Sequence, residues 1–183
     1  KGNRLAIVTN AGGPAVMATD RALDLGLTLA KLSDPTLKTL DENLPGYWSR
    51  ANPVDVLGDA GPERFEAALK ACLGDDGVDG VIAMLTPQAM TEPLGVARVT
   101  ADLARGARKP LLGCWLGEKQ VQAAREHSGR ERLAHFRTPE AAVEAFSYLA
   151  AYQRNQRLLL QVPDPLFDRA GVDIEAARLV IDK

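Results

Sequence analysis

The stretch Leu5-Ala6-Ile7-Val8-Thr9-Asn10-Ala11-Gly12-Gly13-Pro14 decides the fold of this 183-residue chain. Its first four residues are apolar, which is typical of a strand covered on both faces of a parallel sheet. Gly12 and Gly13 permit a tight turn, and Pro14 suits the first turn of a helix. The free N–H groups and the positive dipole end of such a helix favour an anion. The predicted phosphate-binding residues are therefore Asn10, Ala11, Gly12 and Gly13.

This turn lacks the residues that define the better-known nucleotide-binding loops. It does not match GxGxxG, and it has no Lys followed by Ser or Thr, so neither dinucleotide binding nor an autonomous NTPase is predicted. The alternative interpretation is a tight strand-to-helix turn that serves packing alone.

The composition is that of an ordinary globular domain. A hydrophobic content of 46% and a net charge of −2 give no reason to expect a nucleic acid or an acidic membrane as partner. We expect no signal peptide, and the printed residues contain no apolar run near the roughly 20 residues that span a bilayer. Cys72 and Cys114 are isolated, which fits apolar filler in a reducing compartment and no metal site. We therefore expect a cytoplasmic protein.

Strand and helix signals alternate along the chain. The expected strands are 5–8, 27–32, 78–85, 110–116 and 133–136. The expected helices are 15–25, 35–44, 62–73, 93–107, 118–128 and 139–160, the last capped by Thr138. About five mainly parallel strands with helices on both faces predict a flavodoxin-like, doubly wound α/β domain over residues 1–160. Residues 161–183 are expected to be a linker and the start of a following segment, because the chain ends inside a helical pattern.

Ligands of such sheets bind outside the carboxyl ends of the strands. This rule selects loops 10–13, 86–91 and 117–119, and the long loop 45–61 is expected to reach the same rim. That loop holds polar side chains around a rigid proline and glycines just before a helix, a second possible anion cradle. The predicted substrate-binding residues are Asn52, Asp55, Gly58 and Thr86. The alternative for the loop is a capped connection in which Asp59 serves the following helix.

Catalytic side chains are scarce in the sequence. His127 and His135 are the only histidines, and no residues near either of them form a nucleophile–base pair. We therefore assign no catalytic residue and no metal ligand to this chain.

Residues 4–152 resemble the ligase-CoA domain of NDP-forming acyl-CoA synthetases, the family of succinyl-CoA synthetase and the ADP-forming acetyl-CoA synthetases. Five segments carry the resemblance in the right order. They are RLAIVTNAGGPAVMATD (4–20), NPVDVLGDAGPERFEAAL (52–69), DGVDGVIAMLTPQAMTEP (76–93), KPLLGCWLG (109–117) and FRTPEAAVEAFSYLAAYQRNQ (136–156).

The resemblance implies that this chain is one domain of a larger enzyme. Members of the family interconvert acyl-CoA, NDP and phosphate with carboxylic acid, CoA and NTP through acyl phosphate and a phosphohistidine. The phosphohistidine lies between the N-termini of two helices from two flavodoxin-like domains, and residues 10–13 match one of these helices. The loop 52–61 would line the same site. The histidine belongs to a preceding domain and matches neither His127 nor His135, so this chain alone would be inactive.

The implied partners are the CoA-binding, phosphohistidine-bearing and ATP-grasp domains, and residues 161–183 would begin the ATP-grasp region. The whole protein would use CoA, ATP or ADP, and Mg, none of them bound by this chain alone. The resemblance also allows an oligomer. Some members carry a GNAT domain and acetylate protein lysines, so the alternative function is an acyl-CoA-sensing regulatory or scaffolding module. A flavodoxin-like electron carrier is disfavoured by an aromatic content of 5%, with no aromatic beside the anion loop to stack a flavin.

Overall fold

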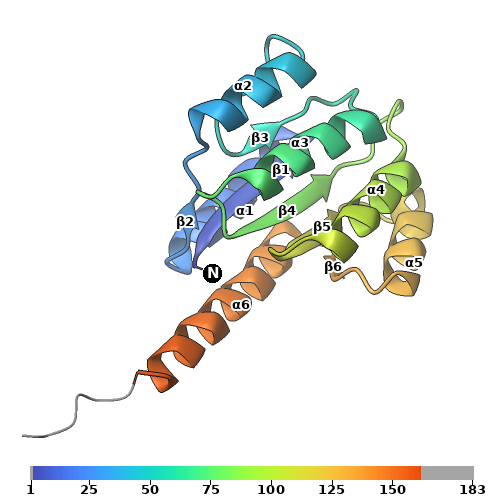
Figure 1. The fold of residues 1–183 in the computed structure, drawn as a ribbon. Helices are drawn as coiled ribbons and strands as arrows, with labels where there is room; N and C mark the ends of the chain where they lie inside the picture. The colour runs from blue at the N-terminus through green and yellow to red at the C-terminus, as the bar shows by residue number, and fades with distance from the viewer. Residues whose placement is uncertain (1, 162–183) are drawn as a thin grey trace, which may run out of the picture.

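A computed structural model describes residues 2–161, in which strands and helices alternate (Figure 1). The strands are β1 (Arg4–Thr9), β2 (Thr28–Leu29), β3 (Val54–Asp55), β4 (Gly80–Leu85), β5 (Leu111–Trp115) and β6 (His135–Phe136). The helices are α1 (Gly12–Asp24), α2 (Asp34–Asn43), α3 (Pro62–Gly74), α4 (Pro93–Gly106), α5 (Gln122–Arg130) and α6 (Pro139–Leu159), with a short 3-10 turn, η1 (Lys119–Val121). The segment predicted for 161–183 lies outside the described residues from position 162 onward.

The sheet has the predicted flavodoxin-like order. All strand pairs are parallel, and the order is β2-β1-β4-β5-β6, with β3 also pairing with β1. The sequence predicted about five strands, and residues 2–161 form six. The additional strand is β3, which lies in the segment 45–61 that was expected to be a loop. Two residues are too few for a strand periodicity to be detected.

One side chain completes an edge of β1 between two short strands. β2 pairs with the first residues of β1 and β3 with its last residues. Between them, Asn52 Oδ1 accepts a hydrogen bond from the Ile7 N–H (3.0 Å), and Asn52 Nδ2 donates to the carbonyl oxygens of Leu5 (2.7 Å) and Ala30 (3.0 Å). The carboxamide thus occupies the place of a strand backbone and satisfies buried polar groups that would otherwise be unpaired.

Helices cover both faces of the sheet, and the chain changes face between β1 and β4. Alternate β1 residues point to opposite sides: Leu5 and Ile7 pack in the cluster that contains α1 and α6, whereas Ala6 and Val8 pack in the cluster that contains α2 to α5. The helix after β1 therefore covers one face, and the helix after β4 covers the other (Figure 1). The topological switch point, where doubly wound folds bind their ligands, lies between the carboxyl ends of these two neighbouring strands.

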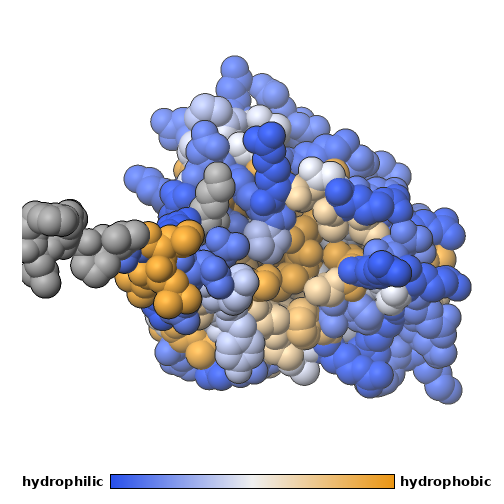
Figure 2. All heavy atoms as spheres, turned by 60° about the horizontal axis from the view of Figure 1, so that its bottom comes forward, coloured by the Kyte–Doolittle hydropathy of each residue, from blue (hydrophilic) through white to orange (hydrophobic). Residues whose placement is uncertain are grey.

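Helix α6 runs back toward the amino-terminal edge of the sheet and extends past it (Figure 1). Thr138 caps its start by accepting a hydrogen bond from the Ala141 N–H (3.3 Å), as predicted. Figure 2 shows apolar surface, in orange, at the left and in the middle of the view. The large exposed apolar residues of α6 and its end are Tyr148, Leu149, Tyr152, Leu158, Leu159 and Leu160. This surface is at the edge opposite the switch point.

Candidate functional site

The N-terminus of α1 presents free backbone N–H groups at the switch point. Ala11 is the N-cap residue and makes no side-chain capping bond, and the first turn contains no acidic residue. Within residues 2–161, the N–H groups of Gly12 and Gly13 have no hydrogen-bond partner. Both glycines are exposed, and a Cβ at either position would meet nothing within 4 Å. The turn is therefore an open, positively polarised cradle that suits an anion.

Asn10 positions this cradle and does not point freely into it. Its side chain is buried, with 2% of the residue exposed. Asn10 Nδ2 donates to the Thr86 carbonyl oxygen (2.9 Å), and the Thr86 N–H donates to Asn10 Oδ1 (2.9 Å). In the same turn, the Ala11 N–H donates to Thr9 Oγ1 (3.2 Å). The carboxamide of Asn10 therefore fixes the end of β1 against the end of β4.

Thr86 has a hydroxyl group with no partner. Its Oγ1 is buried and makes no hydrogen bond within the part of the chain that the structure describes. A buried hydroxyl that is left unpaired costs about 1–3 kcal/mol. Because Thr86 directly follows β4 at the switch point, this oxygen is suited to a ligand in the crevice or to a water molecule that the ligand replaces.

The structure separates the predicted residues of the loop 45–61. Asn52 lies beside the middle of β1, where its carboxamide is used by the sheet, so it is not at the rim. Asp55 ends β3 and is at the rim, where its Oδ1 accepts a hydrogen bond from the Leu57 N–H (2.9 Å). Asp59 does not cap α3, whose N-cap is Gly61. It pairs with Arg64 instead (2.7 Å), and this bond lowers the pKa of the Asp59 carboxyl.

Gln88 is a rim residue of the loop 86–91 that was not among the four predicted substrate-binding residues. A Cβ on Gly58 would lie only 2.4 Å from Gln88 Oε1, so the carboxamide of Gln88 occupies the space in front of this glycine. The sequence had selected the loop 86–91 and, separately, Gly58. No local pattern indicated that the two meet.

Neither histidine lies at this crevice. His135 belongs to β6, at the far edge of the sheet, and its Nδ1 lies 3.2 Å from the Leu133 carbonyl oxygen. His127 is in the last turn of α5. Within residues 2–161, no group of three or more His, Cys, Asp or Glu side chains is placed to hold a metal ion. No helix of this described range is both long and apolar enough to cross a membrane.

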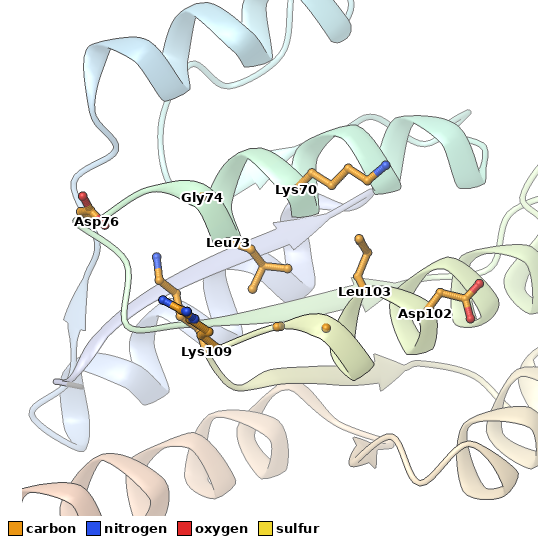
Figure 3. Close-up of a pocket in the computed structure, with 10 residues that line it drawn as sticks. Lys70, Leu73, Gly74, Asp76, Asp102, Leu103 and Lys109 are labelled. Atoms are coloured by element: carbon orange, nitrogen blue, oxygen red, sulfur yellow. The ribbon is translucent and has the colours of Figure 1, made fainter.

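A second concavity lies between the carboxyl ends of α3 and α4 (Figure 3). It has a volume of about 540 Å³, and Leu73 and Leu103 form its apolar floor. Three of its charged groups have partners within the chain: Lys70 pairs with Glu66, Asp102 with Arg105, and Lys109 Nζ donates to the Asp75 carbonyl oxygen (2.5 Å). Because it opens at the amino-terminal edge of the strands, it is not where this fold places a ligand.

The fold and the cradle define a flavodoxin-like, doubly wound domain with an anion-suited helix start at its switch point. Residues 5–159 match the model of the Ligase-CoA domain family. The chain belongs to this family, as the resemblance at the sequence level implied.

Several characterised proteins are similar to this chain. It is 36% identical over 154 residues to the ADP-forming acetate–CoA ligase I of Archaeoglobus fulgidus, a match that covers 84% of this chain and 22% of that protein. It is 32% identical over 163 residues to the alpha subunit of ADP-forming acetate–CoA ligase II of Pyrococcus furiosus, covering 85% of this chain and 35% of that subunit. The chain thus spans between a fifth and about a third of these relatives.

Solved structures agree with this assignment. An acetyl-coenzyme A synthetase 1 of Ca. Korarchaeum cryptofilum, described as dinucleotide-forming, was solved in the apo form and in complex with phosphate and ADP. Each form superposes with a TM-score of 0.81 at 32% identity, covering 88% of this chain and 36% of that one.

Proposed function

We propose that this chain is the ligase-CoA domain of an NDP-forming acyl-CoA synthetase, and that the start of α1 holds the phosphoryl group during transfer. The observation that carries the proposal is the pair of unpartnered N–H groups of Gly12 and Gly13, which lie at the switch point of a chain that belongs to this family. Support also comes from the Korarchaeum relative, which was solved in complex with phosphate and ADP.

The proposed reaction has three transfers. Phosphate attacks the acyl-CoA carbonyl carbon, so that acyl phosphate forms and the CoA thiolate leaves. A histidine on another domain then takes the phosphoryl group and releases the carboxylate. NDP accepts the phosphoryl group from the histidine, and NTP leaves. In each transfer, charge on the phosphoryl oxygens must be held by fixed donors.

This chain's own contribution is electrostatic and positional. The Gly12 and Gly13 N–H groups would donate to phosphoryl oxygens, the dipole of the 13-residue helix α1 would favour the negative charge, and the Thr86 hydroxyl would gain its missing partner. An anion at a helix start gains roughly 0.3–1 kcal/mol, and up to about 2 kcal/mol in a partly buried site. We therefore expect weak binding by this chain alone, because the histidine-bearing half of the site is on a partner domain.

The other substrates belong to other parts of the proposed enzyme. CoA, the nucleotide and Mg are assigned to the CoA-binding and ATP-grasp domains, since the residues of 2–161 form no metal-ligand cluster and the chain spans only part of its relatives. Nothing in the described residues favours the alternative of an acyl-CoA-sensing acetyltransferase module.

The proposal is tested in the whole gene product, or complex, that contains this chain. Incubation with γ-labelled ATP should give acid-labile phosphohistidine on the protein, and carboxylate plus CoA should discharge it. Gly12→Asp should abolish the labelling and leave CoA binding unchanged. Absence of acid-labile label with both ATP and GTP would contradict the proposed function.

A further inference from the structure

We propose that Gln88 is a further ligand-contacting residue of this crevice, whose carboxamide donates a hydrogen bond to an oxygen of the bound phosphoryl group. We also infer that Gly58 is required as glycine in order to seat this carboxamide. The inference rests on the proposed function, because it names an additional contact in the same site.

The contact between Gly58 and Gln88 is so close that any side chain at position 58 would displace the Gln88 carboxamide. A Cβ there would lie 2.4 Å from Oε1, 2.7 Å from Nε2 and 2.9 Å from Cδ of Gln88. All three atoms of the carboxamide are thus nearer than ordinary van der Waals contact allows. An alanine at position 58 must therefore push the Gln88 carboxamide away from its place.

The sheet order determines where this contact lies. Gly58 follows β3 and Gln88 follows β4, and these strands pair with opposite edges of β1. The Gln88 carboxamide therefore reaches across the carboxyl end of β1, next to the turn that starts α1. Both loops continue to helices on the face opposite α1. The contact thus lies at the carboxyl end of β1, on the side of the sheet away from α1.

The loop that presents Gly58 is held on both sides. Arg64 Nη1 donates to the Val56 carbonyl oxygen (3.0 Å) and to Asp59 Oδ1 (2.7 Å). The Ala60 N–H donates to the Leu57 carbonyl oxygen (3.0 Å). The backbone around Gly58 is therefore fixed, and it offers a rigid platform for the Gln88 carboxamide.

The backbone of Gln88 is fixed as well. Its N–H donates to Thr91 Oγ1 (2.9 Å), and the same hydroxyl donates back to the Gln88 carbonyl oxygen (2.9 Å). Gly117, in the left-handed region at φ 97°, brings the loop after β5 against Pro87, whose Cγ would lie 3.1 Å from a Cβ at position 117. The position from which the Gln88 side chain starts is therefore set by the fold.

The Gln88 carboxamide is nevertheless unpartnered. Its side-chain atoms make no hydrogen bond to any of residues 2–161, although its backbone N–H and carbonyl oxygen are both hydrogen-bonded to Thr91. A carboxamide has two N–H donors, and an N–H donated to an anionic oxygen is stronger than one donated to water. An exposed, unpartnered donor on a fixed backbone at a switch point is therefore suited to a phosphoryl oxygen.

The test is a titration of the 183-residue chain with inorganic phosphate, in which ¹H–¹⁵N NMR spectra are recorded at each phosphate concentration. In the wild type, the Gln88 side-chain NH₂ resonances should shift together with the amides of Gly12 and Gly13. Gln88→Ala should weaken phosphate binding about tenfold, as expected for loss of a hydrogen bond to a charged group. Gly58→Ala should weaken it similarly, and the double variant should be no worse than Gln88→Ala alone. Gln153→Ala, an exposed glutamine of α6, is the matched control and should leave the affinity unchanged.

Other outcomes overturn the inference in distinguishable ways. Wild-type phosphate affinity in Gln88→Ala would show that the carboxamide does not contact the phosphate. A loss confined to Gly58→Ala would mean that the ligand approaches Gly58 directly, and Gln88 would then have no role. If the wild-type chain shows no shift at Gly12 or Gly13, the proposed cradle itself fails, and this inference fails with it.

Discussion

The Asn10 carboxamide is hydrogen-bonded to both backbone polar groups of Thr86, 76 positions away in the sequence. This pair ties together the carboxyl ends of β1 and β4, the two strands between which the chain changes face. The spacing between the α1 N–H groups and the hydroxyl of Thr86 is therefore set by a buried side chain. We call these two hydrogen bonds the Asn10–Thr86 clamp. The candidate site depends on this clamp as much as on the glycines that the ligand would touch.

Removal of the clamp should destabilise the fold. Asn10→Ala leaves the Thr86 N–H and carbonyl oxygen unpaired, so we expect a loss of about 2 kcal/mol in the free energy of unfolding. Asn10→Asp should cost more, because a carboxylate cannot donate to the Thr86 carbonyl oxygen. Urea unfolding checks both values. An unchanged midpoint in either variant would contradict the role of this clamp.

The Asn52 carboxamide should be equally important to the sheet edge. Asn52→Ala orphans the Ile7 N–H and removes two bonds to carbonyl oxygens, so a loss of at least about 2 kcal/mol is expected. The Ile7 amide should also exchange its hydrogen faster. Asn43→Ala is the control, since the exposed Asn43 makes one local bond within α2, to the Thr39 carbonyl oxygen. That variant should change stability by less than about 0.5 kcal/mol.

Stability should fall in acid because of two carboxylates at the amino-terminal edge of the sheet. The hydrogen bond from the Arg4 guanidinium (2.7 Å) lowers the pKa of Asp79 well below its usual range, against the opposing effect of burial. Burial alone would raise the pKa of Asp75, but hydrogen bonds from Ser33, Thr36 and Gly77 outweigh it and lower this pKa.

The sign of the effect follows from proton linkage. Because the folded pKa values lie below the unfolded ones, the native state binds fewer protons, and the stabilisation is complete above the unfolded pKa of about 4. It is lost as the pH falls through the folded values. Urea midpoints should be level from pH 7 to 5 and should drop below about pH 4. Asp79→Asn should flatten this acid limb, whereas Asp20→Asn, at an exposed position of α1, should not. Equal acid sensitivity in all three proteins would refute this assignment.

The sequence was sufficient to predict the layers of the fold and the helix start that follows β1. The strands buried on both faces, such as 5–8 and 78–85, are continuous apolar runs, and the helices carry one apolar stripe each, so both signals are local. The same is true of the turn 10–13, whose glycines and proline specify a helix start without reference to the rest of the chain.

The roles of individual polar side chains could not be obtained in this way. Asn52 was expected to bind substrate, yet it replaces a strand backbone between β2 and β3, and this depends on two strands that are each two residues long. The contact between Gly58 and Gln88 spans 30 positions and exists only because β3 and β4 flank β1. Such roles follow from sheet order, which local patterns do not contain.

The central claim is that the start of α1 binds a phosphoryl group, and a phosphate titration of the wild-type and Gly12→Asp chains tests it most directly. Nothing lies within 4 Å of a Cβ at position 12, so the new carboxylate is tolerated and occupies the cradle itself. Gly46→Asp, which places the same charge in an equally open position of another loop, is the control. We predict that phosphate shifts the Gly12 and Gly13 amide resonances of the wild type, that Gly46→Asp behaves likewise, and that Gly12→Asp abolishes phosphate binding while keeping its unfolding midpoint. Phosphate binding of equal strength in Gly12→Asp, or no phosphate-dependent shift at Gly12 and Gly13 in the wild type, would contradict the claim.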